Sequence, residues 1–585
     1  MFSSKTLVKV LALATTASLH VVPAIAQNSK TKSPKIDPVV NFCKRYQHQS
    51  AITDKTLFID GGTQWFHDDP IVWGPTTEGI NTYLVTTDMS DSWDWKGNIS
   101  QTAIYKTREP GRKIGFVPAL NGGAIWPNAN QSSLYFYGGT TNSSLRNFSL
   151  YEDPESDAQT LWKYNIEEKF WDPVDYTKGS SEVTRASYGG SVVAPKLNKA
   201  YYLGGIVDRG STDNSGDLQS PRFLDGLLEF DFGTESVRNI STLGLGNRAR
   251  AYSQVVYIPN YGNGSPSAPG GRKGILVAIG GEMKSSQIVD VSGTRRGDPV
   301  PMSDIAIYDI ETDNWYVQQA EPHANEFPAT RVDHCIVTKS APDNSSHAIN
   351  KKAKHLDDVW ILAVPSFQWI KIFEGESPRY GHTCHVAPQG RQMITVGGLG
   401  TGYTADFNDS RCDWEAKSVA LYDLTTLQWG SAFLAHSDPY QLPVEVAHRI
   451  NGTQSGGGSI ISPPKGWSNP DLQQLFVESP SPPKKTNKGA IAGGVVGGVI
   501  GLAFIISAAF YVHRRYIRRL DRPVPPPPEA QQWAKPELEG CIDGGETPKT
   551  ETPTGPTIFY EIDGKVHRQE LDPTSVRREV PTELP

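Results

Sequence analysis

LYFYGG at 134–139 opens a unit that closes with LWKYNIEEKFW at 161–171, and this arrangement recurs along the chain. Each unit has an apolar run, usually ending in Gly-Gly, then a polar stretch, then a second apolar run that usually ends in Trp. The other first halves read LFIDGG at 57–62, AYYLGG at 200–205, ILVAIGG at 275–281 and MITVGG at 393–398. The units close at Trp93, Trp171, Val237, Trp315, Trp369 and Trp429. Short apolar runs bounded by turn residues predict buried strands.

A further apolar run precedes each unit and often begins with Arg. The residues concerned are Arg45, Arg185, Arg250, Arg331 and Arg379, with His48, His334 and His382 near three of them. Unit five lacks Gly-Gly, and its counterpart is expected at 338–340. One unit cannot bury both faces of its sheet, so radial stacking is predicted, with each Trp between neighbouring sheets.

These units resemble kelch repeats, which form β-propellers with one four-stranded blade per repeat. The resemblance implies an all-β fold, a kelch β-propeller over 43–437 with six blades. A seventh blade would require strands from 438–465. Over the whole chain the sequence resembles the single-pass membrane kelch-repeat proteins of filamentous fungi.

The two ends of the chain predict a membrane topology. Residues 1–26 combine a basic start, a short apolar region and a small-residue cleavage site, which is typical of a secretory signal peptide. Residues 489–512 carry no charge and would span about 36 Å as a helix. We therefore expect the N-terminal part to be extracellular or lumenal and the tail, 513–585, to be cytoplasmic and disordered. Residues 438–488 are rich in Gly, Ser and Pro and predict a disordered stalk.

Glycosylation sequons agree with this topology because all of them precede the apolar segment. They lie at Asn98, Asn130, Asn142, Asn147, Asn239, Asn263, Asn344, Asn408 and Asn451. The chain has 56 basic and 63 acidic residues, a balance that argues against nucleic-acid binding.

Four cysteines precede the apolar segment and allow two disulfides in three connectivities. They are Cys43, Cys335, Cys384 and Cys412. Because Cys384 and Cys412 belong to the same unit, that pair is favoured, which leaves Cys43 for Cys335. Free thiols are the alternative.

Composition and motifs favour binding over catalysis. The longest insertions, at 63–81, 140–160, 206–222 and 282–303, all follow a Gly-Gly strand and should emerge on one face. The first of them supplies a candidate loop for a protein or glycan partner: Trp65, Phe66, His67, Asp68, Asp69 and Trp73. In the tail, the proline run at 523–528 is a candidate ligand for an SH3 or WW domain. No cofactor is expected.

The alternative is a copper oxidoreductase of the galactose-oxidase type that acts on an extracellular carbohydrate. The kelch resemblance brings this class into consideration, because it includes propellers with two His and two Tyr ligands and a Tyr-Cys cross-link. His382 and His385, which flank Cys384, are the one close pair of histidines before the apolar segment. We find no catalytic or metal-binding constellation in the sequence, so a binding protein is the preferred interpretation.

Overall fold

A computed structural model describes most of the chain from residue 37 to residue 476 and a short stretch near 510. The described ranges are 37–67, 77–97, 99–106, 117–141, 161–178, 183–211, 221–246, 249–263, 271–284, 297–322, 324–343, 347–353, 356–400, 412–476, 510–511 and 513–515. The chain divides into two units, 1–484 and 485–585. The predicted signal peptide and nearly all of the tail lie outside the described residues.

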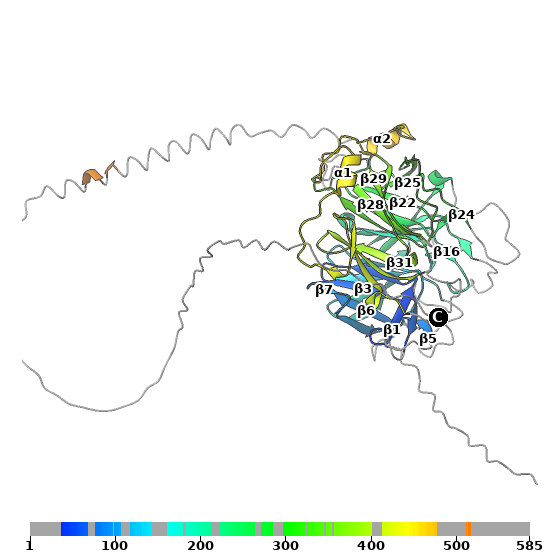
Figure 1. The fold of residues 1–585 in the computed structure, drawn as a ribbon. Coiled ribbons are helices and arrows are strands. Elements are labelled where there is room, and N and C mark those ends of the chain that lie inside the picture. Colours follow the sequence, from blue (N-terminus) through cyan, green and yellow to red (C-terminus); the bar gives the residue numbers. More distant parts are fainter. Residues whose placement is uncertain are drawn as a thin grey trace, which may run out of the picture. The chain divides into compact units, whose positions relative to one another are not determined.

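Six consecutive segments of the described chain each form an antiparallel sheet with four strands in sequence order (Figure 1). We call these sheets blades one to six. Blade one has β2 (Gln49–Ile52), β3 (Thr56–Asp60), β6 (Tyr83–Asp88) and β8 (Gln101–Tyr105), and blade two has β9 (Ala124–Pro127), β10 (Ser133–Tyr137), β11 (Leu161–Asn165) and β12 (Phe170–Pro173). Blade three has β14 (Gly190–Ala194), β15 (Lys199–Leu203), β18 (Leu227–Asp231) and β19 (Ser236–Ile240), with β13 (Thr177–Lys178) added in parallel to β19. Blade four has β21 (Gln254–Ile258), β22 (Ile275–Ile279), β25 (Asp304–Asp309) and β26 (Asn314–Gln319). Blade five has β27 (Cys335–Ser340), β28 (His347–Ala353), β29 (Leu356–Val364) and β30 (Gln368–Glu374), and blade six has β31 (Arg379–Val386), β32 (Gln392–Gly400), β33 (Val419–Asp423) and β34 (Gln428–Gly430).

The first strand of every blade lies beside the first strand of the next. These contacts run from β2 through β9, β14, β21 and β27 to β31, and β31 returns to β2. The sheets therefore form a closed ring around an axis, the arrangement of a β-propeller. The strand predicted before each unit is the innermost strand of its blade. In blade five, 338–340 belongs to innermost strand β27, so the prediction that it replaces Gly-Gly was wrong.

Close contact between blades explains the Gly-Gly pairs. Gly204 has φ +61°, and a Cβ atom there would lie 1.9 Å from the carbonyl oxygen of Arg250 in the next blade. Gly138 is equivalent: its Cβ would lie 2.2 Å from the carbonyl oxygen of Ala186. The next glycine then donates its N–H to that same oxygen, as Gly205 does to Arg250. A side chain would prevent this approach, and the left-handed conformation also favours glycine.

The Trp residues that close units two, four and five pack against the preceding blade, as predicted. Trp315 of blade four donates its indole N–H to the carbonyl oxygen of Ser241, which follows blade three. Trp369 of blade five does the same to Met302 of blade four. Trp171 belongs to a cluster that contains Phe58 of blade one. These side chains fill the space between sheets, where their burial stabilises the ring.

Insertions after the Gly-Gly pairs begin in equivalent places. The first residue or residues pair with the chain just before the innermost strand of the same blade: Thr63 with Tyr46, Thr140 with Asn121, Ile206 with Ser187, and Glu282 with Ala251. The elements involved are β1 (Phe42–Tyr46), β4 (Thr63–Phe66), β5 (Thr77–Ile80), β16 (Ile206–Val207), β17 (Arg222–Phe223), β20 (Arg250–Ala251), β23 (Glu282–Met283) and β24 (Asp298–Pro299). All four insertions therefore leave the ring at the same rim, as predicted.

Residues 438–476 are not the disordered stalk that their composition predicts. They include α1 (Val444–Arg449) and α2 (Pro470–Phe476), and they contribute no strand to a seventh blade. Leu442, Val446 and Ile450 are buried in a cluster with side chains of blades five and six. From α2, Leu472, Leu475 and Phe476 are buried in a cluster with Trp360 and Trp369. Apolar side chains at helical spacing offset the Gly, Ser and Pro content.

The favoured disulfide pairing was wrong. Cys43 is bonded to Cys412, with Cα atoms 4.5 Å apart, and Cys335 is bonded to Cys384, with Cα atoms 5.7 Å apart. Cys335 and Cys384 lie on adjacent innermost strands, β27 and β31. Cys412 lies beside β1, where the Asp413 N–H donates to the carbonyl oxygen of Cys43 at 3.0 Å. Proximity in the ring, rather than membership of one unit, decides the pairing.

Three short 3-10 helices and one small sheet complete the described structure. The helices are η2 (Pro195–Leu197), η3 (Leu243–Leu245) and η4 (Ala416–Ser418), and the sheet pairs β7 (Trp93–Asp94) with β35 (Ala432–Phe433). Among the residues that the structure describes, no helix is long and apolar enough to cross a membrane. The predicted span, 489–512, lies outside those residues except for Phe510 and Tyr511.

Candidate functional site

The predicted partner-binding loop is not an exposed surface where the structure describes it. Trp65, Phe66 and His67 are 9%, 3% and 5% exposed. Trp65 and Phe66 lie on β4, between β1 and β5, and Phe66 is paired with Phe42. Strand pairing on both sides turns these side chains into core, so this part of the prediction was wrong. Asp68, Asp69 and Trp73 lie outside the described residues.

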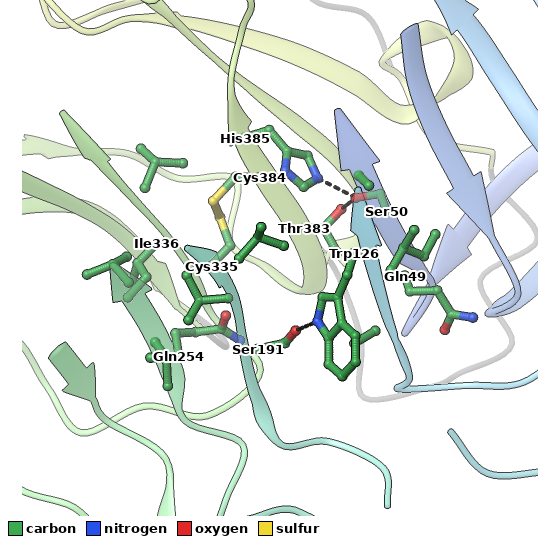
Figure 2. A pocket seen from close by; sticks show the side chains of 18 of the residues that line it. Gln49, Ser50, Trp126, Ser191, Gln254, Cys335, Ile336, Thr383, Cys384 and His385 are labelled. Atoms are coloured by element: carbon green, nitrogen blue, oxygen red, sulfur yellow. Dashed lines mark hydrogen bonds between the residues drawn. A yellow bond between two sulfur atoms is a disulfide. The ribbon is translucent and has the colours of Figure 1, made fainter. Parts of the chain in front are cut away.

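A cavity of about 550 Å³ instead lies at the axis of the ring, lined by innermost strands of all six blades (Figure 2). One end is bordered by six residues with positive φ, one per blade: Gln47, Gly122, Tyr188, Tyr252, Asp333 and Gly381. Five backbone hydrogen bonds connect these residues around the ring, including Gln47 to Gly381 at 2.9 Å and Tyr252 to Tyr188 at 2.7 Å. This girdle of backbone bonds holds the wall of the cavity in place.

A chain of hydrogen bonds crosses from blade one to blade six in the cavity wall. Ser50 Oγ lies 2.7 Å from His385 Nε2 and also contacts Thr383 Oγ1, which lies 3.0 Å from His48 Nε2 (Figure 2 shows the first two bonds). Three hydrogen bonds need three protons and the two hydroxyls supply at most two, so at least one of the two histidines donates its Nε2–H.

Both histidines in this chain are neutral. Burial lowers the pKa of His385 to about 4. Burial also lowers the pKa of His48 well below its usual range, and the nearby Arg45 and His385 add to the effect. The chain therefore presents uncharged donors and acceptors at neutral pH.

Aromatic and amide groups line other parts of the cavity. Trp126 donates its indole N–H to Ser191 Oγ at 2.7 Å, from β9 to the neighbouring β14. Tyr188 and Tyr252 stack with ring centres 5.2 Å apart, and the Tyr188 hydroxyl donates to the side-chain oxygen of Gln47. Burial raises the pKa of both tyrosines, so they remain protonated.

Charge is nearly absent from the lining. Asp333 is the one Asp, Glu, Lys or Arg among the lining residues that the structure describes. Such a wall, made of hydroxyls, amides, neutral imidazoles and aromatic faces, suits an uncharged polar ligand.

The copper alternative meets a chemical obstacle. Cys384, which lies between His382 and His385, is bonded to Cys335, so it is not free for a cross-link to tyrosine. Cys43 and Cys412 are likewise bonded. Within the described ranges, no group of three His, Cys, Asp or Glu side chains could hold a metal ion.

Four sequons fall on described residues. Asn130, Asn239 and Asn451 are exposed, whereas Asn263 is half-buried and donates its side-chain N–H to Asp309 at 2.7 Å. The other predicted sites, Asn98, Asn142, Asn147, Asn344 and Asn408, lie outside the described residues. Use of these sites stays a prediction.

Comparison with known proteins supports the kelch repeat. No family model matches the sequence. The chain is 26% identical over 566 residues to a kelch repeat-containing protein of Arthroderma benhamiae, covering 83% of this chain and 77% of that protein. A solved structure of YjhT aligns with a TM-score of 0.40 and 13% identity, over 67% of this chain and 99% of YjhT. Together with the ring of antiparallel sheets, the Arthroderma relative extends the kelch similarity over most of the chain.

The sequence pattern of the insertions, with its aromatic and acidic residues, predicted a site on the loops and not the axial cavity. A signal was present in the innermost strands. His48, Ser50, Thr383 and His385 follow Gln47 and Gly381 within four residues, so alignment of the six innermost strands would have placed them in one wall.

Proposed function

We propose that this protein is a membrane-anchored binding protein whose six-bladed kelch propeller takes an uncharged carbohydrate in its axial cavity. The observation that carries the proposal is the lining: neutral polar side chains and aromatic rings from all six innermost strands, with one carboxylate. Sugars offer hydroxyls for such donors and acceptors and C–H faces for aromatic rings. A cavity of about 550 Å³ has the size of a small-molecule site, enough for the end of a glycan rather than a protein surface.

Glycan-array binding of the full-length protein in detergent tests this proposal. We expect neutral glycans to bind, and Thr383→Val to reduce that binding at least tenfold, because it removes a hydroxyl that contacts Ser50 and His48. Thr86→Val is the matched control, since Thr86 also bonds a threonine hydroxyl, Thr102, but on outer strands of blade one. Binding that is unchanged in Thr383→Val would contradict the proposal. Capture of a protein partner that Thr383→Val does not affect would favour the rim of the ring instead.

The predicted signal peptide and apolar segment support an extracellular or lumenal propeller and a cytoplasmic tail. Protease treatment of sealed microsomes should remove the tail and spare the propeller. Loss of the propeller with the tail intact would overturn this topology.

We also propose that the proline run at 523–528 binds an SH3 or WW domain. Binding of a peptide with this sequence to such domains measures this directly.

A further inference from the structure

Four arginines occupy the same position in the ring, two residues before the left-handed residue of their blade. Three of them have acceptors. Arg331 donates two hydrogen bonds to Asp358, each at 3.0 Å. Arg379 pairs with Asp413 and Glu415, and Arg250 donates twice to the carbonyl oxygen of Gly280.

The fourth arginine, Arg45, is different. Its side chain is 0% exposed, and Nε, Nη1 and Nη2 all lack a hydrogen-bond acceptor. Its guanidinium lies over the ring of Phe42, 4.3 Å from the centroid. Burial lowers the pKa of Arg45 to about 9, so it still carries its charge at neutral pH. No carboxylate in the described part of the chain forms an ion pair with it. An unpaired buried charge costs several kcal/mol.

Buried polar atoms on two elements that contact β1 also lack partners. Gln64 lies directly opposite Arg45 across the β1–β4 pair, and its Oε1 is buried without a donor. η4 packs against β1, and the buried Oγ of Ser418 in η4 has no partner. Such a group of unsatisfied atoms is typical of a site for a bound ion or water.

The charge of this region is positive. Lys417, also in η4, donates its ammonium N–H to the carbonyl oxygen of Val39. Burial and the charge of Arg45 lower the pKa of Lys417, which places the two cations near one another. Asp37 acts on Lys417, but its carboxylate accepts the backbone N–H groups of Val39 and Val40. Two cations therefore lie in this region, and no carboxylate of the described residues forms an ion pair with Arg45.

We propose that Arg45 binds a small inorganic anion, with chloride as the simplest case, between β1, β4 and η4. The guanidinium has five N–H donors and no acceptor of its own, so its ligand must accept hydrogen bonds, and the unpaired buried charge favours an anion over water. Complete burial of Arg45 favours a small ion over a phosphorylated or carboxylated molecule. Arg45 does not line the axial cavity, although its charge acts on His48 in the cavity wall, and the anion site does not rest on the proposed carbohydrate function.

Thermal unfolding of the full-length protein in detergent tests the proposal. Chloride is varied at constant ionic strength by replacement with gluconate, a much larger anion that we do not expect to reach the fully buried Arg45. We expect Tm to rise saturably, by about 2–4 °C, as chloride is added. If the site accepts any small monovalent anion, nitrate and formate should raise Tm as chloride does. If phosphate alone raises Tm, the chloride assignment is wrong. A Tm that does not depend on any of these anions would overturn the proposal.

Gln64→Glu is the decisive variant because it places a carboxylate directly opposite Arg45. We expect its Tm in gluconate to equal or exceed that of the wild type in chloride, and its chloride response to disappear. Arg45→Met should also lose the response, while Arg222→Met, which changes an exposed arginine on β17, should keep it. A Gln64→Glu protein that is less stable than wild type and still responds to chloride would refute the site even if Arg45→Met failed to fold.

Discussion

Each pair of neighbouring blades meets at an interface that we call a seam. At five of the six seams the chain runs directly from one blade to the next. At the closing seam, between blade six and blade one, no chain segment connects the two blades in this way. At the closing seam, contacts span the full width of the blades. Ser50 and His385 join the inner walls, Cys43 and Cys412 join the rim, and β7 pairs with β35 at the outer edge. The seam between blades five and six has one cross-link of its own, Cys335 with Cys384.

This difference shows how the ring offsets the missing connection. A propeller gains most of its burial between blades, so an open seam would expose two sheet faces at once. The disulfide at the closing seam links residues 369 positions apart, against 49 for the other disulfide. Closure of the longer loop removes more conformational freedom from the unfolded chain.

Removal of the closing disulfide should have the largest effect. By the chain-entropy relation, Cys43→Ala with Cys412→Ala should lower the free energy of unfolding by about 6 kcal/mol, and Cys335→Ala with Cys384→Ala by about 4 kcal/mol. Urea unfolding of both double variants measures the difference. Equal losses, or a larger loss for the Cys335–Cys384 pair, would show that closure depends on the strand and side-chain contacts instead.

Loss of Arg379 should come next, because it leaves two buried carboxylates without a counter-charge. Asp413 and Glu415 are 5% and 10% exposed and both pair with Arg379 within blade six, beside the closing seam, where the Asp413 N–H bonds the carbonyl oxygen of Cys43. We expect Arg379→Met to reduce the free energy of unfolding by about 3–5 kcal/mol.

Lys371→Met is the control for this charge effect. The carboxylates that pair with Lys371, on Glu326 and Glu374, are 61% and 74% exposed. We expect Lys371→Met to lower the free energy of unfolding by at most about 1 kcal/mol. If the two variants were equally stable in urea, the ion pairs beside the closing seam would contribute no more than surface pairs do.

An added methyl group at a seam where the chain connects the two blades should lower the free energy of unfolding by about 2–4 kcal/mol. Gly204→Ala, between blades three and four, would place Cβ 1.9 Å from a carbonyl oxygen in a left-handed conformation. Gly430→Ala is the control, since nothing lies within 4 Å of its Cβ position. Chemical denaturation of both variants measures this difference. A Gly204→Ala protein as stable as Gly430→Ala would mean that the blades separate easily even where the chain connects them.

The regular part of the fold was predictable because each repeat must pack against a blade on either side, and the same residue types recur at these contacts. Gly-Gly marks the contact with the next blade, and Trp marks the contact with the previous one, so both could be read without a structure. Prediction failed where an element packs outside its own repeat. Trp65 and Phe66 read as an exposed loop because the partner strand, β1, precedes the first unit.

The predictions of the disulfide pairing and of a disordered segment after blade six were wrong for related reasons. Cys335 and Cys384 follow the left-handed residues Asp333 and Gly381 by two and three positions, so their proximity depends on the register between blades. In 438–476, composition suggested a stalk, although Leu472, Leu475 and Phe476 already had the spacing of one helical face. The neutral wall of the cavity depends on burial, which no single strand reveals.

Acid should weaken the closing seam selectively, with the smallest effect of the four. His385 has a pKa of about 4 in the folded protein, and histidine in the unfolded chain has a pKa of about 6.5. Between these values the unfolded chain binds more protons, so the contribution of His385 is complete above about pH 6.5 and is lost as pH falls toward 4. The loss by pH 4 amounts to about 2–3 kcal/mol. Tm measured from pH 7 to pH 4.5 should therefore fall less steeply in His385→Gln than in the wild type.

The control for this titration is His436→Gln, which changes an exposed histidine and should keep the steep fall of Tm. His385 bonds Ser50 across the closing seam, and the Cys43–Cys412 disulfide links the same two parts of the ring. Protonation of His385 and loss of this disulfide should therefore both favour separation of blade six from blade one. The acid sensitivity of Tm should then increase in the variant without that disulfide, while loss of Cys335–Cys384 should leave it unchanged. The same pH slope in all three proteins would mean that the ring unfolds as one unit rather than from its closing seam, and the two kinds of seam would then differ in structure but not in stability.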